Sequence, residues 1–126
     1  MSSAASPRTH GLFIDGREVP ASTGETVDVF NPATGEVIAR TVHGTQQDVD
    51  QAVQSARRAF EGKEWGSLDL RSRARLVNKL ADVVEANLPE LFRLETLNNG
   101  RPVNETRAQL SRLPDFFRYN AGLALS

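Results

Sequence analysis

Apolar residues recur at helical spacing through the middle of the chain. Between residues 46 and 60 they share one face of a helix of about four turns, and they are Val49, Ala52, Val53, Ala56 and Phe60. A second series of the same period runs from about residue 70 to 86, where Leu76, Leu80 and Val83 widen the apolar stripe. A stripe this wide predicts burial against more than one neighbour.

Polar and turn-forming residues predict where the first of these helices begins and where a third one ends. Thr45 opens the sequence TQQD, in which Asp48 takes the place of the usual glutamate of a capping box. Pro89 and Gly100 bracket a short helix from about residue 90 to 98, because proline favours the first helical turn and glycine the C′ position. The segment EGKEWGS is expected to be a loop anchored by Trp65.

The last segment is helical in pattern but contains Pro114. Proline in a helix interior removes a hydrogen bond and clashes with the preceding turn. We therefore expect one helix to end near Arg112 and another to run from Pro114 to about Ala124.

The N-terminal third alternates apolar and polar residues as strands do. Asp15-Gly16 in LFIDGREV predicts a type I′ turn between two short strands. The strand TVDVF, residues 26–30, is stopped by Asn31-Pro32, and EVIARTV resumes as a strand after Gly35. Residues 1–10 are small and polar and are expected to form a disordered tail. The prediction is a small antiparallel sheet followed by a mostly helical remainder.

Composition and charge narrow the function classes. The chain has 126 residues, which fits one domain, and its 15 basic and 16 acidic residues give no general attraction to nucleic acid or anionic membranes. The densest basic run, residues 71–79, has no interleaved aromatic residues, which favours a solvated helix face over an RNA or anion patch. No apolar run approaches the roughly 20 residues that span a bilayer. We expect a soluble cytoplasmic protein.

The residue types and motifs do not by themselves predict a reaction. The sequence contains no cysteine, no Gly-rich phosphate loop and no nucleophile elbow. Glu90 and Glu95 are interpreted as surface carboxylates with arginine partners such as Arg93 rather than as an acid–base pair. The polar terminus Asn98-Asn99-Gly100 indicates either a capped helix end or a cluster of carbonyl and amide groups that coordinates a ligand.

Three stretches in this order resemble the N-terminal part of NAD(P)-dependent aldehyde dehydrogenases. They are LFIDGREV with FNPATGEVIARTVHGTQQDVDQAVQSARRAF, WGSLDLRSRARLVNKLADVVEANLPELFRLETLNNGRP, and FFRYNAGLA. The resemblance covers nearly the whole chain from Leu12 onward and well under half of a complete enzyme of the family.

The resemblance implies an α/β fold in which residues 11–126 form the N-terminal, incomplete portion of a cofactor-binding domain. In the family the dinucleotide contacts, the catalytic cysteine and the general-base glutamate lie beyond the matched stretches. The cofactor of the family is NAD or NADP, and we expect neither to bind this chain alone. The reaction of the family turns an aldehyde into a carboxylic acid, and we expect no turnover from these residues by themselves.

The resemblance also implies a monovalent cation site. Family members hold such a cation through backbone carbonyls just before the Asn-Pro turn and an acidic side chain of the ETLxxG motif, which match Val29, Phe30 and Asn98 here. Asn98 stands where the family often has aspartate, and an amide oxygen offers a hard cation no charge. A plain helix cap is the competing interpretation of Asn98.

Two functions from different classes follow. The first is an aldehyde dehydrogenase family protein of which this chain is the N-terminal segment. The alternative is a binding or assembly module that docks on a full-length dehydrogenase or on a separately encoded remainder. The wide apolar face at residues 70–86 suggests this alternative.

Overall fold

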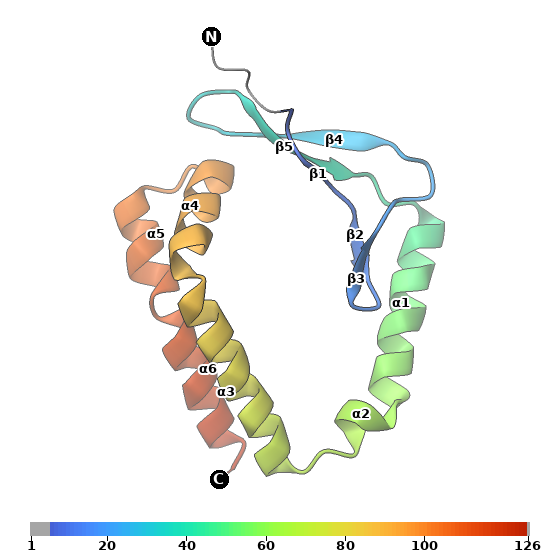
Figure 1. Ribbon diagram of the computed structural model, residues 1–126, viewed down its shortest axis with the longest axis vertical. Coiled ribbons are helices and arrows are strands. Elements are labelled where there is room, and N and C mark those ends of the chain that lie inside the picture. The colour runs from blue at the N-terminus through green and yellow to red at the C-terminus, as the bar shows by residue number, and fades with distance from the viewer. Residues whose placement is uncertain (1–5, 126) are drawn as a thin grey trace. The chain divides into compact units, whose positions relative to one another are not determined.

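The computed structural model describes residues 6–125, which contain five strands and six helices (Figure 1). The strands are β1 (Thr9–His10), β2 (Leu12–Ile14), β3 (Arg17–Val19), β4 (Thr26–Phe30) and β5 (Val37–Val42). The helices are α1 (Gln46–Glu61), α2 (Lys63–Gly66), α3 (Leu70–Ala86), α4 (Leu88–Asn99), α5 (Val103–Leu110) and α6 (Leu113–Leu123).

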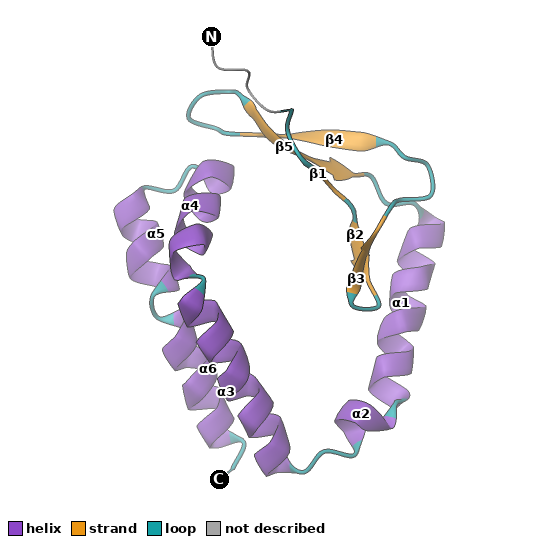
Figure 2. Cartoon of the chain, in the orientation of Figure 1, coloured by secondary structure: helices purple, strands orange, loops and turns teal. Residues whose placement is uncertain are grey.

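The chain divides into two compact units. The first ends at Glu61 and holds all five described strands and α1, and the second begins at Gly62 and holds only helices among its described residues (Figure 2). This order, strands first and helices afterwards, confirms the predicted α/β character with a small sheet and a mostly helical remainder.

The strands of the first unit form two small sheets. β2 and β3 are an antiparallel hairpin, and β5 lies between β4, its antiparallel partner, and β1, its parallel partner. Asp15 and Gly16 both have positive φ, 57° and 75°, as the predicted type I′ turn requires. Asp-Gly supplies this conformation at little cost, because glycine lacks the Cβ that opposes it.

The expected disordered tail of residues 1–10 is wrong at its C-terminal end, where the structure has a strand. Residues 1–5 of that expectation lie outside the described residues, whereas Thr9 and His10 form β1. The amide of Arg40 on β5 donates to the carbonyl of Arg8 at 2.9 Å, and Glu18 accepts from the amide of Gly11 at 2.6 Å. Backbone pairing of this kind needs no apolar side chain, so the polar composition of this segment gave no sign of it.

Asp48 joins the start of α1 to the loop before β4. The residue is 5% exposed, and its carboxylate accepts hydrogen bonds from the amides of Thr45, at 2.8 Å, and of Ser22, at 3.2 Å. The Thr45 hydroxyl accepts in turn from the Asp48 amide at 3.4 Å, which completes the predicted reciprocal cap. These donors hold the pKa of Asp48 below its ordinary value, chiefly the Thr45 amide.

Helices α3 and α6 form the core of the second unit (Figure 1). Small side chains make their close approach possible: Ala74 and Ala81 on α3 and Ala121 on α6 are at most 3% exposed. α4 packs on α5, where Thr106 is completely buried and its hydroxyl accepts from the Thr96 hydroxyl at 3.3 Å. Pro114 lies in the first turn of α6, so the predicted break between the last two helices is confirmed.

The predicted loop at EGKEWGS contains one helical turn, α2. Asp69 then caps α3, since its side chain accepts from the Ser72 amide at 2.6 Å. A single turn offers too few residues for an apolar period, so the sequence pattern did not distinguish it from a loop.

Part of the apolar stripe on α3 stays uncovered within its own unit. Leu76, Leu80 and Val83 are 44%, 47% and 59% exposed, whereas Ala74 and Ala81 of the same helix are buried against α6. Among residues 6–125, no helix is long and apolar enough to cross a membrane.

Candidate cation site

The first half of the candidate site is the end of β4. Val29 pairs with Ala39 and Phe30 with Val37, so one residue of β5 is left over and the ladder contains a bulge at this point. The turn that follows is fixed by Asn31, whose side-chain oxygen accepts from the Ala33 amide at 2.9 Å. A bulge beside a tight turn locally disrupts the ladder and frees backbone groups from pairing.

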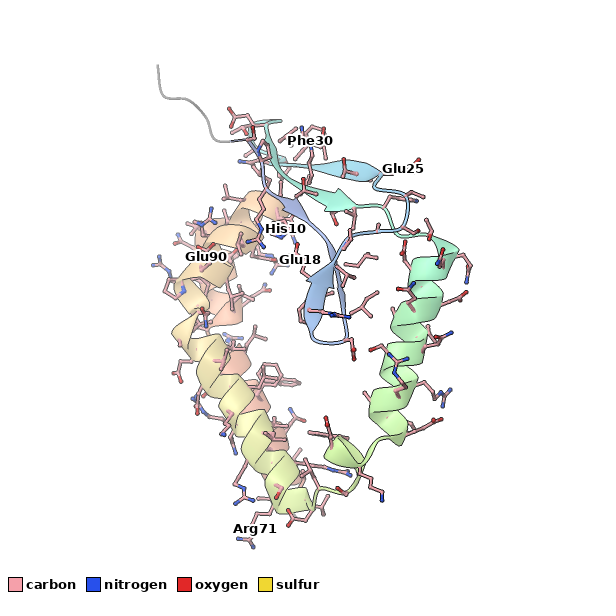
Figure 3. All side chains as sticks on the ribbon, turned by 45° about the vertical axis from the view of Figure 1, so that its right-hand side comes forward. His10, Glu18, Glu25, Phe30, Arg71 and Glu90 are labelled. Atoms are coloured by element: carbon pink, nitrogen blue, oxygen red, sulfur yellow. The ribbon has the colours of Figure 1, made fainter. Side chains whose placement is uncertain are left out.

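Backbone hydrogen bonds show which way the Phe30 carbonyl points. The His43 amide donates to the Glu25 carbonyl at 2.7 Å and the Asn31 amide donates to the Glu36 carbonyl at 2.9 Å. Since alternate residues of an antiparallel strand face the partner, residues 25, 27, 29 and 31 face β5. Phe30 therefore directs its carbonyl away from β5, and β4 is an edge strand of its sheet. Figure 3 labels Phe30 on the ribbon.

The second half is the C-terminal end of α4. Asn98 is exposed, and its side chain has no hydrogen-bond partner within the described chain. Gly100 closes the helix in the left-handed conformation, with φ 76° and its amide 3.0 Å from the Thr96 carbonyl. The carbonyls of the last turn beyond Thr96 have no partner in the helix, and the helix dipole places partial negative charge there.

The two halves lie in different units. Val29 and Phe30 are consecutive residues of β4 in the first unit, whereas Asn98 belongs to the second. The Phe30 carbonyl and the Asn98 amide oxygen are neutral oxygen ligands of the kind that a monovalent hard cation accepts, whereas Val29 faces β5. Sequence comparison alone identified the three positions, while the bulge and the edge carbonyl needed the structure.

The acidic side chains of this region are engaged by arginines. Glu90 accepts from Nε and Nη2 of Arg93 at 2.9 and 2.7 Å, and Glu95 lies 3.3 Å from Nη1 of Arg101. The Arg93 guanidinium holds the pKa of Glu90 below its ordinary value, which is the opposite of what a general acid near neutral pH requires. The interpretation of Glu90 and Glu95 as partnered surface carboxylates is confirmed.

Metal ligation by charged or imidazole side chains finds no support in residues 6–125. No three histidine, cysteine, aspartate or glutamate side chains of this part lie close enough to hold a metal ion. His10 and His43 are both exposed, the first in β1 and the second after β5.

The starts of α1 and α3 carry carboxylates, which do not suit a pyrophosphate. Dinucleotide phosphates bind to free amides at a helix start, where the dipole is positive. Here Asp48 accepts from the amide of Thr45, just before α1, and Asp69 accepts from that of Ser72 at the start of α3, and both carboxylates would repel a phosphate. α4 and α6 carry proline in their first turn, which removes one donor each.

A groove between α4 and α5 was not predicted from the sequence. It has a volume of about 520 Å³ and its floor is apolar, formed by Pro89, Phe92, Leu97 and Val103. Arg93 and Arg107 stand beside it, the former paired with Glu90. The four apolar residues come from two helices, so no single periodic pattern in the sequence outlines the groove.

Comparisons with known proteins agree with one another. The family model described as the aldehyde dehydrogenase family matches residues 19–126. A mitochondrial aldehyde dehydrogenase of Mesocricetus auratus is 41% identical over 115 residues, which are 90% of this chain and 23% of that relative. The solved structure of a Bacillus cereus aldehyde dehydrogenase mutant superposes with a TM-score of 0.85 at 38% identity, over 90% of this chain and 23% of the other.

A betaine aldehyde dehydrogenase from Staphylococcus aureus, solved in complex with NAD+, gives a TM-score of 0.83 at 37% identity over 87% of this chain and 22% of the other. The chain thus spans about 23% of the length of the curated relatives it matches.

Proposed function

Because this chain belongs to the aldehyde dehydrogenase family, we propose that it forms the N-terminal structural segment of an enzyme that oxidises an aldehyde to a carboxylic acid with NAD or NADP. The observation that carries this proposal is the match of residues 19–126 to the family. In this role the segment supplies packing surfaces and backbone carbonyls, and the reacting groups come from elsewhere in the enzyme.

The residues of the chain support a structural rather than a chemical role. The family reaction needs a thiolate that adds to the aldehyde carbon, and these 126 residues include no cysteine. Asp48 and Asp69 place carboxylates at the starts of α1 and α3, which opposes the binding of cofactor phosphates at these two helices. We expect that neither NAD nor NADP binds this chain in isolation.

The partner of the segment is the remainder of an aldehyde dehydrogenase or a full-length subunit. The exposed part of the α3 stripe, Leu76, Leu80 and Val83, gives this partner an apolar surface to cover. These side chains are already about half buried, so covering the rest of one of them gains roughly 1 kcal/mol. The same surface supports the alternative function, an assembly module that docks on a separate dehydrogenase subunit.

The cation site belongs to this proposal. From the match to the family we propose Val29, Phe30 and Asn98 as oxygen ligands of a monovalent cation, the first two through backbone carbonyls and Asn98 through its amide oxygen. A cation bound by neutral oxygens would order the backbone around it without supplying chemistry to the reaction. Its role here is to order backbone.

Turnover and cofactor binding by the purified chain test the proposal. NADH formation with a short aliphatic, a long aliphatic and an aromatic aldehyde should equal that of a sample without protein. Titration with NAD+ and NADP+ should give no binding heat. Turnover above the protein-free rate would overturn the structural role, since it would require a nucleophile that these residues lack.

A further inference from the structure

The pair Asn99-Gly100 lies at the exposed end of α4. It is not among the proposed cation ligands and is not part of the buried core of the second unit. It is the only Asn-Gly pair in the sequence. Asn99 is exposed, and Gly100 ends the helix with φ 76°. Water therefore reaches both residues, and no side chain at position 100 shields the peptide bond between them.

An asparagine followed by glycine can modify itself. The Gly100 nitrogen attacks the side-chain carbonyl carbon of Asn99, a new C–N bond closes a five-membered succinimide, and the side-chain nitrogen leaves as ammonia. Water then opens the ring at either carbonyl and gives aspartate or isoaspartate. The sequence of steps needs water and no oxidant, reductant or enzyme. Glycine at the second position places no Cβ beside the attacking nitrogen, so the ring closes readily.

Two hydrogen bonds oppose this reaction in the folded chain, and both lie in the last turn of α4. The Gly100 amide donates to the Thr96 carbonyl at 3.0 Å, which keeps the attacking nitrogen engaged. The Asn99 side-chain amide donates to Oε1 of Glu95 at 3.3 Å, near the upper limit of a hydrogen bond. Terminal turns of helices open at little cost in free energy. The protection at this site is therefore small.

From this geometry we propose that Asn99 is a site of spontaneous deamidation, reached when the last turn of α4 opens. The product changes the end of the helix in two ways. Isoaspartate adds a methylene to the backbone between residues 99 and 100, so the Gly100 amide no longer reaches the Thr96 carbonyl in the observed geometry. Aspartate places a carboxylate beside Glu95 and at the negative end of the helix dipole, and both are unfavourable.

Mass spectrometry of the aged, folded chain tests the proposal. Trypsin does not cut between Arg101 and Pro102, so one peptide from Leu94 to Arg107 carries Asn98, Asn99 and Asn104. Asn98 and Asn104 are followed by residues with a side chain and serve as internal controls. After incubation at neutral pH, the exchange of amide for carboxylate is expected at Asn99 several times faster than at the two controls. Equal rates at the three positions would overturn the proposal.

Two further samples separate the motif from the fold. The free peptide of residues 94–107 should deamidate at Asn99 only somewhat faster than the folded chain, because the last turn opens easily. A folded chain that stays unmodified while the free peptide reacts would overturn the proposed opening. Asn99→Gln keeps the amide but forms a six-membered ring slowly, so it should abolish isoaspartate in the chain; isoaspartate that persists in this variant would assign the reaction elsewhere.

Discussion

Arg118 on α6 places Nη2 2.9 Å from Oδ1 of Asp82 and 2.5 Å from Oε2 of Glu85, both on α3. The two carboxylates lie one helical turn apart on α3, so a single guanidinium contacts both of them. They hold the pKa of Arg118 above its ordinary value, chiefly through Glu85. This bridge links α6 to α3 through partly exposed charged side chains.

Arg118→Gln is expected to lower the urea midpoint of unfolding of the second unit, because it removes the charge that both carboxylates share. The three groups are partly exposed, so the loss should shrink at high salt, where the screening length falls from about 10 Å at 0.1 M to about 3 Å at 1 M. Arg112→Gln, just before α6 and exposed, is the matched control. A loss that is equal at both salt concentrations would contradict the electrostatic origin.

Ala81→Leu is expected to destabilise the second unit by about 1–3 kcal/mol, because Ala81 is completely buried where α3 meets α6 and a larger side chain has no room. Ala86→Leu at the exposed end of the same helix should change stability by less than about 0.5 kcal/mol. Chemical denaturation followed by circular dichroism measures both. Equal effects of the two variants would show that the interface between α3 and α6 is looser than described.

Asp48→Asn is expected to remove part of the acid sensitivity of the first unit. The folded-state pKa of Asp48 lies below the ordinary value of about 3.9, so its contribution is present above that pH and disappears as the pH falls through the lower folded value. The wild-type chain should be the more stable at neutral pH, and the difference should vanish in acid. Asp50→Asn, exposed on the same helix, is the control. A difference that is constant with pH would contradict the assignment.

Asn98→Asp is expected to strengthen any response of the thermal midpoint to sodium or potassium, because the variant adds the carboxylate that the candidate cation site lacks. The measurement compares each cation with choline at constant ionic strength, which leaves general screening unchanged. Asn104→Asp on α5 is the control for added charge. Identical midpoints in sodium, potassium and choline for both variants would argue against a cation at Asn98.

Local chemistry predicted most of the elements. The positive φ values at Asp15 and Gly16 follow from what a type I′ turn demands, and the Thr45–Asp48 cap follows from the spacing TQQD. Both are decided within four residues, so tertiary context does not override them. The helical periods of α1 and α3 extend over several turns, which is why their ranges were predicted closely.

The features that could not be predicted from the sequence depend on contacts between residues far apart in the chain. β1 depends on the bond between the Arg40 amide and the Arg8 carbonyl, which involves no side chain. Ser22 reaches Asp48 across 26 positions, and no local pattern indicates that partner. For the cation site, family resemblance gave the positions of Val29, Phe30 and Asn98, while the outward carbonyl of Phe30 depends on the register of β4 with β5.

We propose that this chain is a structural segment of an aldehyde dehydrogenase whose reacting groups lie elsewhere in the enzyme. One assay tests it most directly: aldehyde-dependent NADH formation by the chain alone, by a related aldehyde dehydrogenase expressed without the segment matched here, and by the two together. We predict no turnover from either part alone and turnover from the mixture, lost when Leu80→Asp disrupts the exposed face of α3. Turnover by the chain alone, or a mixture as inactive as its parts, would contradict the account.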